Sequence, residues 1–540
     1  MRHLLCLGVC CLAAALNGFG KEAMPHLARN GDATQLIVDG KPFIMIAGEL
    51  HNSSASDPAY LTRALDKTAS LNANTVLAPV SWELFEPEEG RFDNTLVDHM
   101  IREARARQLK LVILWFGSWK NGVSSYAPEW VLRDTARFPR ARGSSNRNVK
   151  DVLSTHSDAC RDADTKAFAA LMRRIRKVDT RHTVIAVQVE NEMGIRPEIR
   201  DLSETADAAY RQPVPAELME HLARHRDALH PVLAKRWETG GFRTAGAWEE
   251  VFGGGAGAEE LFSVWHYARY TQTIAAAGKR EHPLPLFVNA WLPDPGGKPG
   301  NYPSGGPVVH VHDIWRAAAP DIDIFAPDIY LNTFKEVCAD FTRNGNPLLI
   351  PEAHRGDDMA ARAYWAFGHH GALCFAPFGI ESVDAAHPVT RAYAILRQLV
   401  PLIGAAQGTG RLAAFYQQQD GDAPQRVTLG DWRFRVSAIK GAEHNGRSGA
   451  ILIQTAPDEL IIAGHGFELG RDGLTDPAGR SGAISSVEMG RVENGAFIPE
   501  LRLNGDESGA NNVARVPAFA SNLFLDPTMP RILRVRMYRY

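Results

Sequence analysis

Two glutamates follow apolar runs that have the character of buried strands. The segment Val184–Gly194, VIAVQVENEMG, passes from β-branched residues directly into Asn191 and Glu192, and the segment Pro347–His354, PLLIPEAH, ends on Glu352 in the same way. A buried parallel strand has this pattern where it surfaces at its carboxyl end. Hydrolysis of an acetal needs a carboxylic acid to protonate the leaving oxygen and a carboxylate on the opposite side. The two segments therefore predict the carboxyl pair of a glycosidase.

The elements that must position these carboxyl groups are parallel strands. From Leu36 onward, apolar runs alternate with helical segments, which is typical of βαβ units. Eight strands are expected, over residues 43–47, 75–80, 110–115, 184–189, 284–289, 322–326, 348–351 and 372–376. They predict an α/β fold, a (β/α)8 TIM barrel whose active site lies where the strands end. An open doubly wound sheet is the alternative, but no Gly-rich phosphate loop follows the first strand.

Changes of composition divide the chain into three parts. Residues 1–20 have a short basic start and an apolar run too short to span a bilayer, which predicts a signal peptide and export to the periplasm or beyond the cell. Residues 30–404 hold the predicted catalytic barrel, with long loops after strands three and four. Residues 405–540 carry short strands between Gly and Asp turns, which predicts a C-terminal β-sandwich.

The overall composition restricts the classes of partner. The chain has 540 residues, 45% of them hydrophobic, and a formal net charge of −3, which gives no reason to expect nucleic acid or an anionic membrane. We expect a carbohydrate as the partner, no membrane span and no cofactor. The oligomeric state stays open, a dimer included, and so does the pairing of Cys160, Cys338 and Cys374.

Further side chains at predicted strand ends could contact a sugar. Side chains alternate along a strand, so Glu190 and Glu192 share a face and either could be the proton donor. Trp115 and Trp291 lie near the ends of strands three and five and could stack on a sugar, although a rim aromatic is as often core or lid packing. Glu49, at the end of strand one, could accept a sugar hydroxyl or form an internal salt bridge.

The sequence resembles glycoside hydrolase family 35, the β-galactosidase family within clan A. The segment Trp82–Asp93, WELFEPEEGRFD, is similar to the family signature Trp-x-x-His-Glu-Pro-x-x-Gly-x-Phe-Asp. The segment Gln188–Gly194 reproduces the pattern Gln-x-Glu-Asn-Glu-x-Gly. The resemblance implies that Glu192 is the acid/base, that Glu352 is the nucleophile, and that hydrolysis proceeds with retention.

The same resemblance implies roles for three neighbouring side chains. Asn191 would hydrogen-bond the sugar 2-hydroxyl, and Glu190 would be a ligand or a scaffold residue. Tyr330, just past strand six, matches the clan position whose phenol contacts the nucleophile, with a buried tyrosine of satisfied hydroxyl as the alternative. The negative charge of Glu352 should keep Glu192 protonated in the free enzyme.

The sequence differs from the family motifs at several positions, and these differences indicate a particular branch of the family. Phe85 stands where the family has histidine, and the segment Gly48–Asn52, GELHN, replaces the usual Gly-Ser-x-His-Tyr. These differences resemble a divergent bacterial branch that removes galactose from plant cell-wall oligosaccharides such as xyloglucan. The resemblance thus implies an exo-acting β-galactosidase. A clan A β-glycosidase of other sugar specificity and a noncatalytic carbohydrate-binding barrel stay open as alternatives.

Histidines support a competing interpretation, a metal-dependent barrel hydrolase. The candidates are the segment His310–Asp313, the pair His369–His370, Asp328 and His354. The His-x-His pair precedes a predicted helix, whereas metallohydrolase barrels place such a pair at the end of the first strand. We therefore expect no metal site.

Overall fold

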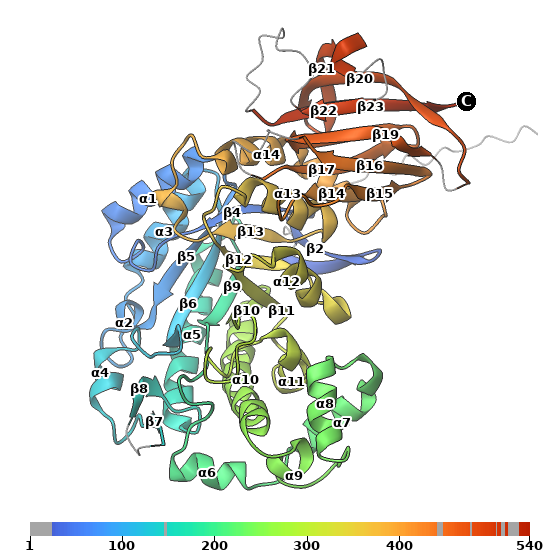
Figure 1. Ribbon diagram of the computed structural model, residues 1–540. Helices are drawn as coiled ribbons and strands as arrows, with labels where there is room; N and C mark the ends of the chain where they lie inside the picture. The colour runs from blue at the N-terminus through green and yellow to red at the C-terminus, as the bar shows by residue number, and fades with distance from the viewer. Residues whose placement is uncertain are drawn as a thin grey trace, which may run out of the picture.

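Eight parallel strands close into a barrel in the computed structural model (Figure 1). The structure describes residues 24–144, 148–439, 447–475, 478–503, 505–508, 513–516 and 529–540, so the predicted signal peptide, residues 1–20, lies outside the described residues. The barrel strands are β4 (Met45–Glu49), β5 (Thr75–Ser81), β6 (Lys110–Lys120), β9 (Val184–Asn191), β10 (Leu286–Trp291), β11 (Ile324–Ile329), β12 (Leu349–Ala353) and β13 (Cys374–Pro377). Each predicted strand overlaps one of them, which confirms the TIM barrel.

Helices cover the outside of the barrel. They are α1 (Pro58–Ser70), α3 (Thr95–Ala106), α5 (Asp158–Val178), α10 (Ala256–Glu281), α11 (His312–Ala318), α12 (Phe334–Phe341), α13 (Met359–His369) and α14 (Pro388–Ala406). Local sequence fixes where they begin. Asp57 caps α1 by accepting from the amide of Tyr60, and Pro58 supplies a fixed φ at the first position. The residues that α1 buries, Leu61, Ala64, Leu65 and Thr68, recur at helical spacing.

Two long insertions follow β6 and β9, as expected. The first holds α4 (Glu129–Arg133) and the hairpin of β7 (Arg140–Arg142) and β8 (Asn148–Leu153). The second holds α6 (Glu204–Tyr210), α7 (Ala216–Arg224), α8 (Pro231–Thr239) and α9 (Trp248–Phe252), a helical group at the end of the molecule away from the C-terminal module (Figure 1). Short helices complete the chain: α2 (Trp82–Phe85), η1 (Arg226–Ala228), η2 (Val309–Val311), η3 (Arg343–Gly345), η4 (Ile380–Ser382) and η5 (Gly505–Ser508).

A small antiparallel sheet, which the sequence analysis missed, precedes the barrel. Its strands are β1 (His26–Asn30), β2 (Ala33–Val38) and β3 (Lys41–Pro42). Leu36 and Val38 of β2 pack in one buried cluster with side chains of the barrel strands, among them Ala47, Leu77 and Leu114. The first sheet therefore contributes to the same core as the barrel.

The C-terminal module is a β-sandwich, as predicted. One sheet holds β14 (Leu412–Tyr416), β17 (Gly449–Ala456), β18 (Glu459–His465), β23 (Arg531–Arg539), β20 (Gly482–Glu493) and β21 (Ala496–Leu503) in that order. The other holds β15 (Gln425–Leu429), β16 (Trp432–Ala438), β19 (Phe467–Thr475) and β22 (Val513–Val516). Both sheets contribute to one core, in which Leu452 and Ile462 meet Trp432 and Phe467.

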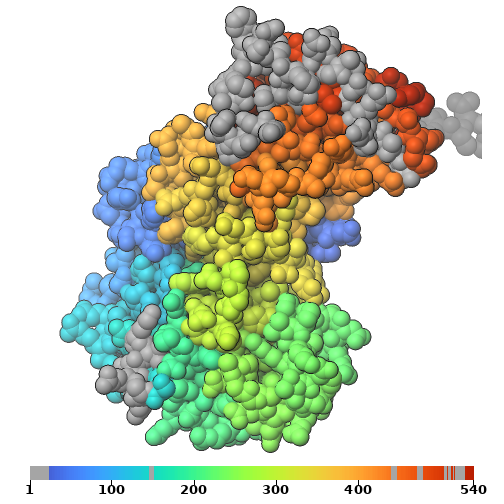
Figure 2. Space-filling view, viewed as in Figure 1, coloured from blue at the N-terminus to red at the C-terminus, as the bar shows by residue number. Residues whose placement is uncertain are grey.

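The sandwich packs directly on the barrel. Its larger sheet contributes Ile451 and Ile453 to the core cluster that also holds residues of α13, and Figure 2 shows the orange and red module seated on the yellow part of the barrel. The contact is close because Gly368 of α13 has no side chain. A Cβ at that position would lie 2.7 Å from the carbonyl oxygen of Ala413 and 2.9 Å from Cγ1 of Ile451.

Two further findings concern open questions from the sequence. Cys160, Cys338 and Cys374 are buried, free thiols. Along the ranges that the structure describes, we find no helix with the length and apolar character needed to cross a membrane.

Gly368→Val should destabilise the protein by about 1–3 kcal/mol, because the new side chain must displace backbone of β14. Urea titration of the free energy of unfolding measures the loss. Gly254→Ala is the matched control, since a Cβ at residue 254 meets nothing within 4 Å. An unchanged unfolding free energy for Gly368→Val would contradict the close packing of sandwich and barrel.

Candidate active site

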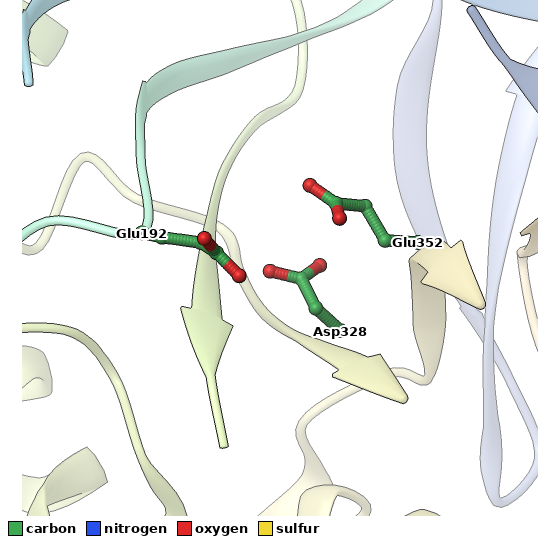
Figure 3. A group of neighbouring side chains, drawn as sticks. All are labelled: Glu192, Asp328 and Glu352. Atoms are coloured by element: carbon green, nitrogen blue, oxygen red, sulfur yellow. The ribbon is translucent and has the colours of Figure 1, made fainter. Parts of the chain in front are cut away.

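Glu192 and Glu352 meet at the carboxyl ends of the barrel strands. Figure 3 shows their carboxyl groups and that of Asp328 turned toward one another, and oxygens of all three lie within 4.8 Å of each other. Glu192 follows directly on β9 with a φ of 43°, in the left-handed region, which turns the chain out of the strand. Its amide donates to Oδ1 of Asn289 at 2.9 Å. The pair that the sequence singled out is therefore brought together.

Asp328 is a third carboxyl group in the same cluster. It lies on β11 directly opposite Glu352 of β12, and its Oδ2 accepts from Nδ2 of Asn289 at 2.8 Å. Burial raises the pKa of Asp328 well above its ordinary value, and the negative charges of Glu352 and Glu192 raise it further. Both causes favour the protonated form of Asp328.

Lys120, the last residue of β6, brings a positive charge to these acids. Its Nζ lies 3.8 Å from Oε1 of Glu352 and 4.8 Å from the ring centroid of Phe116, and its side chain is buried. Burial by itself lowers the pKa of Lys120, but the neighbouring acids, Glu352 first among them, more than offset this and raise it. The ammonium group therefore stays charged beside Glu352.

Glu352 faces hydrogen-bond donors as well as this cation. The hydroxyl of Tyr330 donates to its Oε2 at 2.8 Å, which is the contact that the family resemblance implied. Nδ2 of Asn191 lies 3.5 Å from its Oε1. These contacts to its two oxygens fix the direction of the Glu352 carboxyl group.

The environment of Glu192 favours its protonated form. Burial, followed by the negative charge of Glu352, raises the pKa of Glu192 to about 7, while Lys120 and Arg196 oppose this rise. The expected cause, the charge of Glu352, is therefore present but comes second to burial. Two neighbouring carboxyl groups with different protonation states are what acid–base chemistry at neutral pH requires.

Glu49 lies in the same charged environment but outside the pocket lining. It is fully buried, and neither carboxyl oxygen has a hydrogen-bond partner within the ranges that the structure describes. Burial and the charge of Glu352 raise its pKa well above the ordinary value, which favours the neutral form of Glu49. Its carboxyl group forms no salt bridge there, and contact with a sugar hydroxyl stays a prediction.

A cavity of about 380 Å³ opens over the carboxyl cluster. Its lining combines acids, amides and aromatic rings: Asn52, Lys120, Asn121, Glu192, Trp291, Leu292, Asp294, Asp328, Tyr330, Leu331, Glu352 and Phe378. Trp291 and Tyr330 are 36% and 44% exposed, so both present accessible ring surface. The cavity has the size and the mixed lining of a small-molecule site.

Two side chains that were predicted to contact a sugar, those of Trp115 and Glu190, are buried and do not line the cavity. Trp115 is fully buried against α5, and its indole donates to Oδ1 of Asp164 at 2.9 Å. Glu190 is also fully buried and accepts from the backbone amides of Ser118, at 3.1 Å, and Trp119, at 2.7 Å. Both side chains support the end of β6, which corrects the expectation that they contact a sugar and confirms the scaffold alternative for Glu190.

The sequence analysis missed Lys120 and the role of Asp328 in this cluster. The predicted third strand ended at Trp115, because Gly117 and Ser118 interrupt the apolar run, whereas β6 continues to Lys120. A lysine five residues past an apolar strand was a usable signal, since an isolated charge at a barrel end needs a partner. Asp328 is likewise a single charged residue in an apolar run, but the sequence analysis considered it only as a metal ligand.

Two histidines of the competing metal interpretation have partners outside the carboxyl cluster. His310 contacts a carboxyl oxygen of Glu260 at 3.0 Å, and the buried His312 contacts the carbonyl of Pro307 at 3.0 Å. Among described residues, the group that could share a cation is Glu192, Asp328 and Glu352 themselves. There Lys120 already supplies positive charge.

Two family models match separate parts of the chain. The model of glycosyl hydrolases family 35 matches residues 35–233, and that of a domain of unknown function, DUF5597, matches residues 389–514. A beta-galactosidase of Xanthomonas manihotis is 31% identical over 185 residues, which is 32% of this chain and 27% of that protein. Beta-galactosidase-1-like protein 3 of Mus musculus is 28% identical over 29% of this chain and 23% of its own length. The chain thus spans only about a quarter of the relatives it matches.

Solved structures show a more distant likeness. The cold-adapted beta-galactosidase of Rahnella sp. R3 has a TM-score of 0.45 and 16% identity, covering 67% of this chain and 57% of that one. The beta-galactosidase of the psychrophilic Marinomonas ef1 has a TM-score of 0.47 and 12% identity, covering 68% and 63%. The fold assignment rests on the closed barrel itself and not on these likenesses.

The pKa of Glu192 should move in opposite directions in two variants. Lys120→Met should raise it above about 7 by roughly one pH unit, because a positive charge that favours the ionised form is lost. Glu352→Gln should lower it, because the neighbouring negative charge is lost. Carboxyl carbon-13 NMR titration measures both, with Glu192→Gln to identify the signal. A shift in the same direction in both variants would contradict the charge arrangement.

Proposed function

We propose that the chain is a member of glycosyl hydrolases family 35, whose model matches residues 35–233, and that it is a retaining β-galactosidase. The observation that carries the proposal is the approach of Glu192 and Glu352 to within 4.8 Å. Retaining glycosidases hold their two carboxyl groups about 5 Å apart, whereas inverting enzymes leave room for a water molecule between them, at about 6.5–9.5 Å. The short separation supports direct attack by a carboxylate.

The first chemical step forms a glycosyl ester. Glu352 attacks the anomeric carbon, and the bond from that carbon to the leaving oxygen breaks as Glu192 donates its proton to that oxygen. A donor with a pKa of about 7 keeps its proton below neutral pH. Lys120 and Tyr330 hold the attacking carboxylate in place before the bond forms.

The second step reverses the roles. Ester formation removes the negative charge of Glu352, which lowers the pKa of Glu192 and lets it act as a base. Water attacks the anomeric carbon, Glu192 takes its proton, and Glu352 leaves as a carboxylate. Two displacements at one carbon restore the starting configuration.

The finer assignment is removal of terminal β-D-galactose from plant cell-wall oligosaccharides or polysaccharides such as xyloglucan. Curated relatives that match part of this chain are called beta-galactosidases, which supports galactose as the sugar that is released. The divergent segments around Phe85 and Glu49 support the cell-wall branch. Exo action fits a cavity of about 380 Å³ above the two glutamates.

We further propose that the protein is exported, to the periplasm or out of the cell, which fits the apolar start of the chain. Asn191 is assigned to the sugar 2-hydroxyl.

The leaving group should decide how much activity each glutamate variant loses. Glu352→Ala should lower kcat/KM by roughly 10⁴-fold for every β-galactoside, because no covalent ester forms. Glu192→Gln should lower it by roughly 10²–10⁴-fold for methyl β-galactoside but far less for dinitrophenyl β-galactoside, whose leaving oxygen needs no proton. Rates on a panel of β-glycosides, with the released anomer followed by NMR, measure both effects.

Glu129→Gln is the matched control, since Glu129 is 71% exposed and is not among the residues that line the cavity. If the protein cleaves a different glycoside, and Glu192→Gln and Glu352→Ala lower that activity in the same way, the mechanism stands but the sugar specificity is not for galactose. Full activity in Glu352→Ala would end the proposed mechanism. Sugar binding without turnover of any panel member would favour a noncatalytic carbohydrate-binding barrel.

A further inference from the structure

Trp291 forms a wall of the cavity on the side of Glu192. Phe287 of β10 lies opposite Gln188 of β9, and Trp291 and Glu192 each follow four residues later along their chains. On its other side, Trp291 lies opposite Asp328 of β11. The indole therefore stands at the level of the carboxyl cluster, next to the proposed proton donor.

The exposure of Trp291 is unusual for so large an apolar side chain. Seven large hydrophobic residues of the described ranges are exposed, and of these only Trp291 and Tyr330 line the cavity above the two glutamates. Tyr330 already donates its hydroxyl to Glu352. Trp291 has 36% of its surface exposed, and this apolar surface in a concave, otherwise polar site is typical of a ligand contact.

Arg196 holds the ring from the other side. Its guanidinium carbon lies 4.8 Å from the centroid of the Trp291 ring, within the range of a cation–π contact, and Arg196 is not part of the cavity lining. One ring face is thus covered by the guanidinium, and the accessible part of the indole faces the cavity. The positive charge of Arg196 also lowers the pKa of Glu192, so the same residue acts on the ring and on the acid.

The position next to Glu192 determines which part of a substrate Trp291 can meet. The oxygen that leaves must lie within hydrogen-bond distance of Glu192, so the leaving group starts on this side of the cavity. A pyranose has apolar C–H faces that can pack on an aromatic ring, while its hydroxyl groups need polar partners. Asp294, which also lines the cavity, offers carboxyl oxygens to such hydroxyls.

We propose that Trp291, oriented by Arg196 and assisted by Leu292 and Asp294, forms a binding subsite for a sugar in the leaving-group position. The inference rests on the proposed glycosidase function and adds to it the residues that bind the leaving-group sugar. The preferred substrates are glycosides whose leaving group is another pyranose, and simple alkyl glycosides make less use of the site.

Trp291→Ala should discriminate between two leaving groups of similar acidity. Loss of the ring should lower kcat/KM for a β-galactosyl disaccharide at least tenfold more than for methyl β-galactoside, mainly through KM, because only the disaccharide reaches the subsite. Trp291→Phe should recover most of the loss. Tyr60→Ala is the matched control, because Tyr60 is an exposed aromatic of α1 outside the cavity and its loss should leave both substrates unchanged.

Binding of a non-hydrolysable, sulfur-linked galactosyl disaccharide tests the subsite without turnover. Trp291→Ala should weaken this binding at least tenfold and change the binding of free galactose much less. Equal losses for the disaccharide and methyl β-galactoside, or undiminished binding of the sulfur-linked disaccharide, would overturn the subsite while the proposed function stands. Weakened binding in a protein that cleaves neither galactoside would instead support the subsite and end the proposed function.

Discussion

Repulsion between two carboxyl groups held within 4.8 Å of each other is the constraint on which the rest of the site depends. Both cannot be ionised at low cost in a buried place, so one proton stays between them. Burial raises the pKa values of Asp328 and Glu49 well above the ordinary range, so these two acids favour their neutral forms, and the buried ammonium of Lys120 offsets negative charge in the cluster. The cluster thus places the ammonium of Lys120 beside Glu352 and favours a proton on Glu192, which is the proton donor that a double displacement needs at its start.

The closed barrel produces this arrangement through strand register. Asp328 and Glu352 are directly opposite on neighbouring strands, Trp291 is opposite Asp328, and Lys120 is opposite Asn191. Groups far apart in the sequence therefore reach one level of the barrel without any long loop to position them. The loops supply the surroundings instead. Arg196, from the insertion after β9, contacts the ring of Trp291 and influences the acid at the same time.

The sequence predicted the barrel and the glutamate pair because both depend on strong local patterns. Buried parallel strands are nearly continuous apolar runs, and a glutamate that ends such a run is conspicuous. Predictions failed where side-chain direction was needed. Trp115 was expected at a strand end, but β6 runs on to Lys120 and turns the indole toward α5. Glu190 was expected on the face of Glu192, but φ values of 62° and 43° at these two residues break the alternation. The sheet of β1 to β3 was missed because its strands are short and only partly apolar.

Covalent trapping of the nucleophile tests the central claim most directly. A 2-deoxy-2-fluoro-β-galactoside with a dinitrophenyl leaving group should form the glycosyl ester faster than water removes it, because the fluorine destabilises both transition states and the good leaving group speeds only the first. Peptide mass spectrometry should then find one added fluorosugar on Glu352, and none in Glu352→Gln. A label on Asp328 or Glu49, or inactivation without any covalent label, would contradict the assignment of Glu352 as the nucleophile.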